Sequence, residues 1–571
     1  MRRIFMKASN KEASAPVARP TIAIMQMTRL GDLIQTAQAI ETLKTTHPHY
    51  RVVLIARLQF AKPLGFLLNK YFDHIYTLDT ASMFQDSETV GLSKPLSGLN
   101  AFLSEVKSEK IDVLVNLSFS KSSSHLASLI PAVHKVGSYH DHNNKVVMND
   151  KWSQMLYSTV MRGALNPYSL VDLFKNIVGI KAHEPARSTK TNDQRANIIV
   201  IHPFASSERK AWKAEKWVEV IYKTLKENDK QTVTIVGAKN EILKAQVITE
   251  SPLLKQFSSR LLNVTGKTSL EELSQVVASA KLFVGHDSMV GHLAAIHNTP
   301  SLTISLGNVR PHETTPYQAN AYNIAPRTKC FPCFPSDDCA YTQCHHDIPY
   351  QLVSNIIKQL TSGAPIDAEW MKSSNSSFHL SSVNFYRSRF QNGYFTLDNL
   401  IDTQLDINDI FRTLYKVTWS FVLSDVEDSH PFPKLSPSTH RDLLDAMTGL
   451  QHLFELSEFG QKYSRYILEE ISSSTPSISK IKEYSKKIDE IDHLQRMVQK
   501  TSPYLAPIID YFTVRKGNLF GENVVKLTES SYYCFEENAH LSSVMYELVQ
   551  NTIAEYKIIG SKTKTRSDLN K

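Results

Sequence analysis

The chain has 571 residues, of which 42% are hydrophobic and 21% charged, a composition typical of globular domains and sufficient for about three of them. The formal net charge of +8 is small for this length, which disfavours a nucleic-acid-binding surface and leaves anionic ligands or an anionic membrane face open. No stretch has the apolar length of a signal peptide or of a membrane span. We therefore expect a cytoplasmic protein.

Strand-like and helix-like segments alternate from Thr21 onward. In chain order, they include the strand TIAIMQM (21–27), the helix GDLIQTAQAIETLKTTHP (31–48), and the strands RVVLIA (51–56), IDVLVNL (111–117) and HKVGSY (134–139). Such alternation predicts parallel strands covered by helices on both faces. The polar stretch 183–197 interrupts the pattern, and we interpret it as a linker between two domains.

The alternation resumes after this linker. The predicted elements are strands at 198–203, 232–237, 261–266, 282–285 and 301–306, and helices at 214–228, 269–280 and 288–297. Two consecutive doubly wound α/β halves predict a cleft, because ligands of open α/β sheets bind beyond the carboxyl ends of the strands. Beyond about residue 375, apolar residues recur at helical spacing, which predicts an all-helical appendage.

The loop MTRLGDLIQT follows the first predicted strand. Gly31 allows a tight turn, and Asp32 lies in the first turn of the next helix. Asp32 is either a helix cap, worth ~1 kcal/mol, or a general base in the cleft.

Two loops of the second half carry groups suited to a nucleotide. In HPFASSERKAWKAEKW, the hydroxyls of Ser206 and Ser207, the Lys210 ammonium and free helix N–H groups suit a phosphate; the alternative is a solvated loop. In IVGAKNEIL, the Glu241 carboxylate suits ribose hydroxyls, although an ordinary helix start would look the same.

The stretch VGHDSMVGHLAAIHNTPSLTISLG supplies a fourth polar turn. Asp287 and Ser288 begin a helix whose first N–H groups present donors to an anion, and His292 projects from its first turn. A packing role is the alternative for His292.

Four of the five cysteines lie close together in the sequence, and only Cys534 lies elsewhere. The four are Cys330, Cys333, Cys339 and Cys344. In a reducing compartment such a group favours a metal over disulfides, and four thiolates can close a tetrahedral zinc or iron site. His345 and His346 are reserve ligands, and a loop with free cysteines is the alternative.

Together, RLGDLIQT, KAW with the downstream Trp217, VGAKNE and DSMVGHLAAIHNTPSLTISLG resemble the motifs of glycosyltransferase family 9 heptosyltransferases, over about residues 21 to 350. The resemblance implies the GT-B fold, an α/β architecture of two facing Rossmann-like domains. The resulting organisation is a flexible N-terminus (1–19), an acceptor domain (20–182), a linker (183–197), a donor-binding domain (198–372) with a cysteine finger (330–344), a helical appendage (375–560) and a disordered tail (561–571).

The resemblance also implies inverting transfer of a heptose from ADP-heptose, with no cofactor required for transfer. We expect a lipopolysaccharide core acceptor, and the four cysteines lead us to expect a structural zinc or iron in the finger. Asp32 would be the base that deprotonates the acceptor. The donor would be held by residues of the second domain: Ser206 or Ser207 with Lys210 on the diphosphate, Glu241 on the ribose, and Asp287, Ser288 and His292 around phosphate and sugar. The sequence departs from the family at Met289, which occupies a glycine position.

Two other functions remain open from the sequence. Protein-modifying heptosyltransferases resemble the chain in a cysteine finger that holds iron, and the helical appendage suits a protein acceptor, whereas the mild basic balance suits a lipid-linked saccharide at the inner membrane face. A non-catalytic scaffold derived from the GT-B fold is favoured by Met289 but opposed by the retained Asp32 and Lys210.

Overall fold

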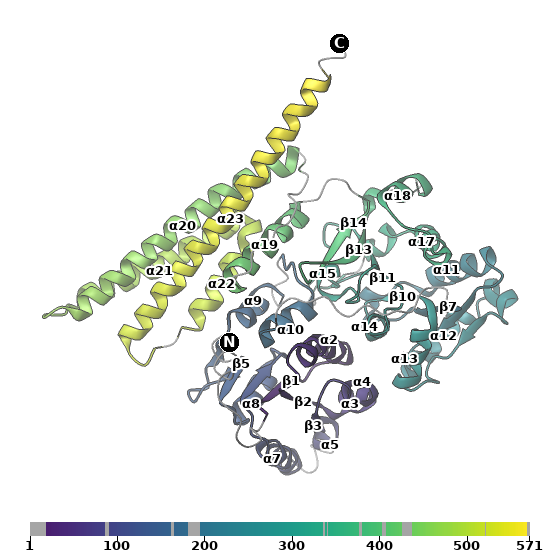
Figure 1. Ribbon diagram of the computed structural model, residues 1–571, viewed down its shortest axis with the longest axis horizontal. Coiled ribbons are helices and arrows are strands. Elements are labelled where there is room, and N and C mark those ends of the chain that lie inside the picture. Colours follow the sequence, from purple (N-terminus) through teal and green to yellow (C-terminus); the bar gives the residue numbers. More distant parts are fainter. Residues whose placement is uncertain are drawn as a thin grey trace. The chain divides into compact units, whose positions relative to one another are not determined.

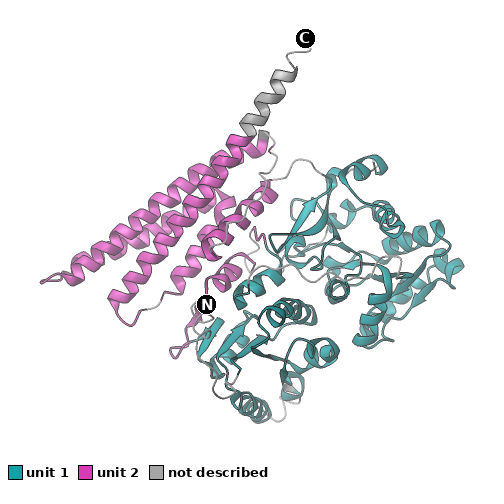
Figure 2. Ribbon diagram, in the orientation of Figure 1, with its two compact units in different colours: residues 1–140, 168–402 teal, residues 141–167, 403–571 magenta. Residues whose placement is uncertain are grey.

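The computed structural model describes residues 19–85, 91–160, 165–180, 195–334, 337–339, 341–375, 378, 380–401, 407–424, 435, 437–519 and 521–567. The chain divides into two compact units (Figure 2): unit 1 comprises residues 1–140 and 168–402, and unit 2 comprises residues 141–167 and 403–571. Residues 1–18 and 181–194 lie outside the described residues, so the predicted flexible N-terminus and most of the predicted linker do too.

The first sheet of unit 1 has its parallel strands in the order β3-β2-β1-β4-β5. These strands are β1 (Thr21–Gln26), β2 (Arg51–Arg57), β3 (His74–Leu78), β4 (Val113–Asn116) and β5 (His134–His140). Strand β1 is buried along its whole length, and its Met25 pairs with Ile55 on one side and Asn116 on the other. The strand order reverses at β1, and such a switch point is where open α/β sheets place their ligands.

Helices flank this sheet as the alternation predicts (Figure 1). They are α2 (Leu30–Thr46), α3 (Leu58–Ala61), α4 (Gly65–Leu68), α5 (Thr80–Phe84), α7 (Ser93–Lys107), α8 (Lys121–Leu129) and α10 (Leu170–Val178). The core beneath them combines strand residues such as Met25 and Val53 with helix residues such as Phe102 and Leu126.

The second sheet has the order β14-β13-β12-β11-β10-β7-β8-β9. Its strands are β7 (Ala196–His202), β8 (Thr232–Ile235), β9 (Leu261–Asn263), β10 (Ala280–His286), β11 (Ser301–Ile304), β12 (Ala321–Pro326), β13 (Val383–Gln391) and β14 (Tyr394–Asn399). All neighbouring strands from β9 to β12 are parallel, whereas β13 and β14 pair antiparallel.

The β13–β14 hairpin differs from the sequence-based expectation, which assigned residues from 375 onward to helices. Asn392 and Gly393 both have positive φ, 51° and 80°, as a two-residue turn requires, and Asn-Gly is the preferred pair there. Helical structure beyond the hairpin begins at Ile407 in the described chain.

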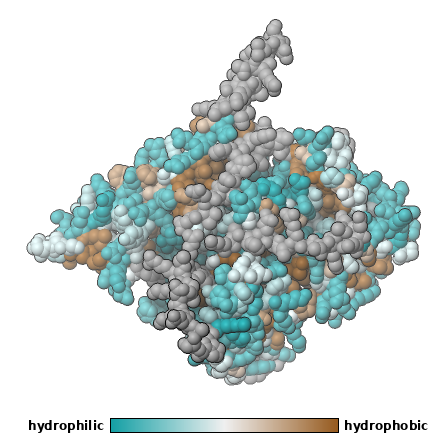
Figure 3. All heavy atoms as spheres, viewed as in Figure 1, coloured by the Kyte–Doolittle hydropathy of each residue, from teal (hydrophilic) through white to brown (hydrophobic). Residues whose placement is uncertain are grey.

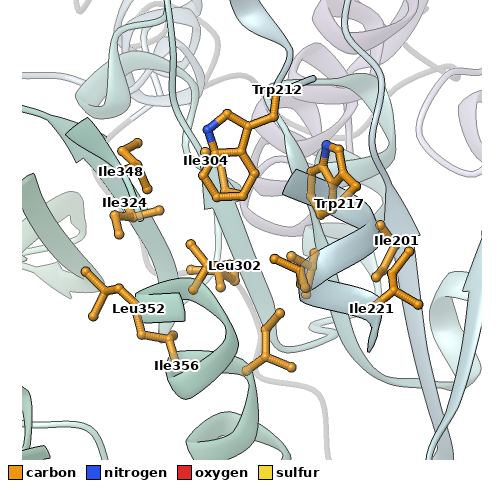
Figure 4. Close-up of a cluster of buried hydrophobic side chains, with 14 of the residues drawn as sticks. Ile201, Trp212, Trp217, Ile221, Leu302, Ile304, Ile324, Ile348, Leu352 and Ile356 are labelled. Carbon is orange, nitrogen blue, oxygen red and sulfur yellow. The ribbon is translucent and has the colours of Figure 1, made fainter. Parts of the chain in front are cut away.

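The helices of the second half of unit 1 are α11 (Ala214–Glu227), α12 (Ile242–Thr249), α13 (Leu270–Ser279), α14 (Met289–Ile296), α15 (Pro311–Thr314), α16 (Gln343–Asp347), α17 (Tyr350–Ser362) and α18 (Ala368–Ser374). Trp217 of α11 is fully buried and shares one core with Ile201, Leu302 and Ile304 of the sheet (Figure 4). Burial of such side chains contributes roughly 1.5–3 kcal/mol each, so α11 holds firmly the loop that precedes it.

Unit 2 is mainly helical, which confirms the predicted fold class of two Rossmann-like domains followed by a helical region. Its elements are β6 (Val146–Met148), α9 (Lys151–Thr159), α19 (Ile407–Ser424), α20 (Pro437–Ser472), α21 (Ile478–Thr501), α22 (Ala506–Gly517) and α23 (Val524–Ser567). Helix α20 packs along α21 and α23 (Figure 1), around a core that includes Ile488, Phe512 and Phe535.

Two features of unit 2 depart from the sequence-based layout. Residues 141–167, expected in the first α/β domain, cluster with the C-terminal helices, where the Trp152 indole N–H donates to Ser424 Oγ at 3.1 Å. Helix α23 extends to Ser567, within the segment 561–571 that we expected to be disordered, because each residue added to a formed helix gains a hydrogen bond.

The described helices include none that is both long enough and apolar enough to cross a membrane. On the face shown in Figure 3, hydrophobic residues are interspersed with hydrophilic ones.

Candidate active site

Each of the four polar turns identified in the sequence follows the carboxyl end of a parallel strand of unit 1. Helix α2 follows β1, the short helix η3 (Glu208–Lys210) follows β7, the short helix η4 (Lys239–Glu241) follows β8, and α14 follows β10. Since this is the ligand-binding edge of an open α/β sheet, chain topology alone places these turns where a substrate would bind.

His292 of α14 lies against the start of α2. A Cβ atom built on Gly31 would lie 3.2 Å from Cδ2 of His292, so the residue beside Asp32 touches the imidazole of the second domain. Burial lowers the pKa of His292, and the negative charges of Asp287 and Asp32 oppose this shift. The ring is therefore a neutral imidazole near two carboxylates, and its Nδ1 is buried without a hydrogen-bond partner among the described residues.

This contact predicts that Gly31→Ala reduces transfer several-fold. The added methyl group would lie 3.2 Å from His292 Cδ2, closer than ordinary van der Waals contact, and displace the ring, while the helical position tolerates alanine. Steady-state kinetics with a melting curve would check this. Gly98→Ala is a useful control, because the three atoms nearest to its Cβ all belong to the flexible Met83 side chain, and equal losses in both variants would contradict a specific role for the contact.

Asp32 is half-buried at the N-terminus of α2. Its Oδ2 accepts a hydrogen bond at 3.1 Å from the N–H of Arg29, the N-cap residue. Asp32 is therefore the third helical residue of a capping box and not the N-cap itself. The cap does not exclude chemistry, because a carboxylate has two oxygens and about four acceptor sites.

Lys210 and Asp287 pair across two of the loops. The Lys210 ammonium lies 3.3 Å from Asp287 Oδ2, with side-chain exposures of 18% and 15%. The Lys210 N–H donates to the carbonyl oxygen of Ser207 at 3.1 Å, while the side chains of Ser206 and Ser207 are exposed. The Lys210 side chain therefore points toward the start of α14. Ser206 and Ser207 lie in the same loop as Lys210.

The N-terminus of α14 carries hydrogen-bond donors that are available to a ligand. Ser288 is the N-cap residue, but its side chain makes no capping bond, and its Oγ is buried without a hydrogen-bond partner in the described part of the chain. Helix N-termini leave N–H groups unpaired and carry partial positive charge. With Lys210 nearby, this turn is suited to an anion such as a phosphate.

Glu241 is held by two groups. Its Oε2 accepts a hydrogen bond from the Ala238 N–H at 2.7 Å and lies 3.7 Å from His202 Nε2. Burial raises the pKa of Glu241, but the neighbouring His202 and the hydrogen bond from Ala238 outweigh it, so the net pKa is lowered. The Glu241 carboxyl is therefore ionised and can accept hydrogen bonds from hydroxyl groups such as those of a ribose. Sequence reasoning missed His202, although its place at the end of β7 was a usable signal.

His286 at the end of β10 also escaped the sequence-based list of site residues. It is fully buried; Nε2 accepts a hydrogen bond from the Trp212 N–H at 2.9 Å, so Nδ1 donates to the Ile304 carbonyl at 3.1 Å. These bonds hold the segment just after Lys210 against the carboxyl ends of β10 and β11.

Residues 100–343 match the model of glycosyltransferase family 9 (heptosyltransferase). This chain carries a glycosyltransferase family 9 region. Lipopolysaccharide heptosyltransferase 3 of Escherichia coli (strain K12) is 21% identical over 285 residues, 48% of this chain and 79% of that protein. Lipopolysaccharide core heptosyltransferase OpsX of Haemophilus influenzae is 24% identical over 234 residues, 38% of this chain and 64% of that protein.

Among solved structures, the family 9 glycosyl transferase from Veillonella parvula shares 17% identity, with a TM-score of 0.45, and is covered over 99% of its length by 61% of this chain. The family match and the two curated relatives support a glycosyltransferase related to heptosyltransferases, as the motifs predict. The family match contains the loops of Lys210, Glu241 and Asp287 but begins after Asp32.

The pKa of His286 gives the transferase a testable pH dependence. Burial lowers this pKa to about 3, whereas a histidine in an unfolded chain titrates near ~6.5. Between these values the unfolded chain binds the extra proton, so His286 destabilises the fold progressively as pH falls from about 6.5 towards 3.

We therefore expect His286→Gln, which keeps a donor and an acceptor but does not titrate, to show a flatter fall of Tm over this pH range than the wild type. Differential scanning calorimetry would measure it, with the exposed His142→Gln as control. Parallel profiles for wild type and His286→Gln would contradict a neutral buried His286.

The four cysteines of the finger are free thiols that lie near one another. Cys333 and Cys344 are buried, Cys330 is exposed and Cys339 is half-buried. Burial, and then the neighbouring cysteines, raises the pKa of the Cys333 and Cys344 thiols. No group of three or more His, Cys, Asp or Glu side chains in the described residues is arranged to hold a metal ion. The described cysteine sulfurs are therefore not arranged as the ligands of a metal ion. A zinc or iron site stays a prediction from the sequence.

That prediction has a direct measurement. If the thiols close around a metal, protein purified under reducing conditions should contain about one zinc or iron per chain, and Cys333→Ser with Cys344→Ser should lose it. Cys534→Ser is the matched control, since that buried thiol belongs to the core of unit 2. Elemental analysis without stoichiometric metal would leave the finger an ordinary loop.

Proposed function

We propose that the chain is an inverting glycosyltransferase that transfers a heptose from ADP-heptose to a lipopolysaccharide core acceptor. The observation that supports the proposal is the contact of Gly31 with His292, because Asp32, which follows Gly31, is close enough for its charge to act on this histidine of α14. A base for the acceptor and donors for a leaving diphosphate are then available at one place.

In this proposal Asp32 removes the proton from the acceptor hydroxyl as its oxygen attacks the anomeric carbon. The new carbon–oxygen bond forms on one face while the bond to the diphosphate breaks on the other, so the configuration inverts and ADP leaves. General base catalysis of this kind contributes about 10²- to 10⁴-fold. No cofactor is needed to balance the reaction.

The negative charge that grows on the leaving diphosphate is stabilised by groups already in place. Hydrogen-bond donors for the diphosphate come from the Lys210 ammonium, the hydroxyls of Ser206, Ser207 and Ser288, and the first N–H groups of α14. Charge stabilisation by such preorganised donors is usually the largest catalytic contribution. Glu241 accepts hydrogen bonds from the ribose. Neutral His292 and the carboxylate of Asp287 border the sugar.

The donor is tested by a thermal-shift screen of ADP-, GDP- and UDP-sugars, because a ligand that binds only the folded state raises Tm by mass action. We expect the largest shift from ADP-heptose, and release of ADP when a lipopolysaccharide core acceptor is added. Binding of another nucleotide sugar alone would reject ADP-heptose as the donor. The screen matters here because Met289 stands at a glycine position of the family, which can change the choice of donor.

Unit 2 favours a second acceptor class, since its long helices offer a surface for a protein. Transfer to protein side chains, with no transfer to the saccharide core, would select this alternative. Donor binding with neither hydrolysis nor transfer would instead indicate a non-catalytic scaffold. For a lipid-linked acceptor, the proposal places the enzyme in the cytoplasm, with peripheral contact at the inner membrane.

A further inference from the structure

The cysteine finger contacts the loop that carries Lys210. We call residues 206–210 the donor loop and the described residues of 330–347 the cysteine segment. Arg209 Nη1 donates hydrogen bonds to the carbonyl oxygens of Phe334, at 3.3 Å, and Asp337. In the opposite direction, the carbonyl oxygen of Arg209 lies 3.0 Å from His345 Nε2, which must donate because a carbonyl only accepts.

A third backbone segment closes this junction. The Cys333 N–H donates to the carbonyl oxygen of Gly307 at 3.0 Å. Gly307 has a φ of +63°, and a Cβ there would lie 2.7 Å from the Arg209 carbonyl oxygen. The approach is so close that only glycine fits, and the donor loop, the cysteine segment and the end of the β11 region are therefore held together.

The other side of Lys210 is attached to the same segment. Lys216 of α11 donates from Nζ to the carbonyl oxygens of His345 and Ile348, the latter at 2.8 Å, and its ammonium lies 4.8 Å from the centroid of the Trp212 ring. Residues before and after Lys210 are thus bonded to the cysteine segment, whereas the Lys210 side chain points to Asp287.

We infer that Arg209 is a positioning residue for donor binding: by joining the donor loop to the cysteine segment, it holds Lys210 at Asp287 before the nucleotide sugar arrives. This inference rests on the proposed function. A loop that is already in its bound conformation loses less conformational freedom on binding, so affinity rises without a new contact to the ligand. The cysteine segment then supports the donor site whether or not its thiols bind a metal.

The experiment measures the Kd of ADP by calorimetry, and kcat and KM for the donor, in the full chain. Arg209→Ala should raise both the ADP Kd and the donor KM about 5- to 50-fold, with the acceptor KM unchanged. This is less than the full loss of two hydrogen bonds from a charged group, because only the part that orders the donor loop for the ligand enters the binding energy. Arg260→Ala is the matched control, because Arg260 also donates to backbone carbonyls of this domain, those of Leu225, Asn228 and Gln231. It should lower Tm and leave the ADP Kd unchanged.

Arg209→Lys separates positioning from charge, and also serves if Arg209→Ala does not fold. Lysine keeps the positive charge but lacks the planar guanidinium that sets Nη1 between the carbonyl oxygens of Phe334 and Asp337, so the ADP Kd should stay raised by at least about threefold. Full recovery by lysine, or an ADP Kd within twofold of wild type in Arg209→Ala, would overturn the inference.

Lys210→Ala distinguishes this failure from failure of the proposed function. Weaker ADP binding in Lys210→Ala with wild-type binding in Arg209→Ala would reject the positioning role alone. A wild-type chain that does not bind ADP would reject the proposed donor and the inference with it.

Discussion

Asp32→Asn should lower kcat by about 10²- to 10⁴-fold, the contribution of a general base, while the donor Kd stays within about twofold of wild type. The amide oxygen of asparagine can still accept the hydrogen bond that the Arg29 N–H donates to Asp32 at the third position of the helix. The loss of a negative charge in the first turn costs only about 0.3–1 kcal/mol. The substitution therefore removes the basic carboxylate and keeps the local structure. Transfer kinetics, calorimetry with ADP and a melting curve would check all three expectations.

Asp112→Asn is the matched control for this variant. Asp112 also accepts a hydrogen bond from a backbone N–H, that of Thr21 at 2.7 Å, but it lies at the opposite end of β1, away from the proposed site. We expect it to change Tm and not kcat. Wild-type turnover by Asp32→Asn would reduce Asp32 to a helix cap.

The repeated strand-and-helix alternation was sufficient to predict two parallel sheets, because buried parallel strands are nearly continuous apolar runs. The β13–β14 hairpin was missed although Asn392 and Gly393 are a recognised turn pair, since its strands follow a helical stretch and pair at the far edge of the second sheet. The grouping of residues 141–167 with the C-terminal helices depends on long-range packing, such as Trp152 with Ser424, which no local pattern reveals.

The candidate site also has a part that the sequence predicts and a part that it does not. The loops of Asp32, Lys210, Glu241 and Asp287 could be identified because topology places every such turn at one edge of a sheet. Their partners could not be identified, since the contacts span long stretches of sequence: His292 with Gly31, His202 with Glu241, and His286 with Trp212. A buried histidine and a catalytic histidine look alike in a sequence, and only their hydrogen bonds separate them.

The cysteine finger shows which contacts the sequence could not predict. The spacing of Cys330, Cys333, Cys339 and Cys344 favours a metal, yet the backbone contacts of the cysteine segment with Arg209 and Gly307 are what tie it to the donor loop. Backbone carbonyls carry no sequence signal, so this connection was not predictable from residue types.

Lys210→Ala should weaken donor binding by about 1.5 to 3 kcal/mol, the range for hydrogen bonds to charged groups, or roughly 10- to 150-fold in Kd. Two effects act together. The variant loses the ammonium that would contact the diphosphate, and it leaves the Asp287 carboxylate, 3.3 Å from that ammonium, without its counter-charge beside an anionic ligand. The loss should therefore lie at the upper end of the range.

Adding Asp287→Asn to Lys210→Ala separates the two effects in the calorimetric measurement of ADP affinity. If repulsion by Asp287 contributes, the double variant binds ADP more tightly than Lys210→Ala alone, because the unpaired negative charge is gone; if only the lost ammonium matters, the two variants bind equally. Lys213→Ala removes the same charge from an exposed position of the neighbouring segment and should change the Kd little. Unchanged ADP affinity in Lys210→Ala would mean that Lys210 does not bind the nucleotide, and would contradict a diphosphate site at the donor loop.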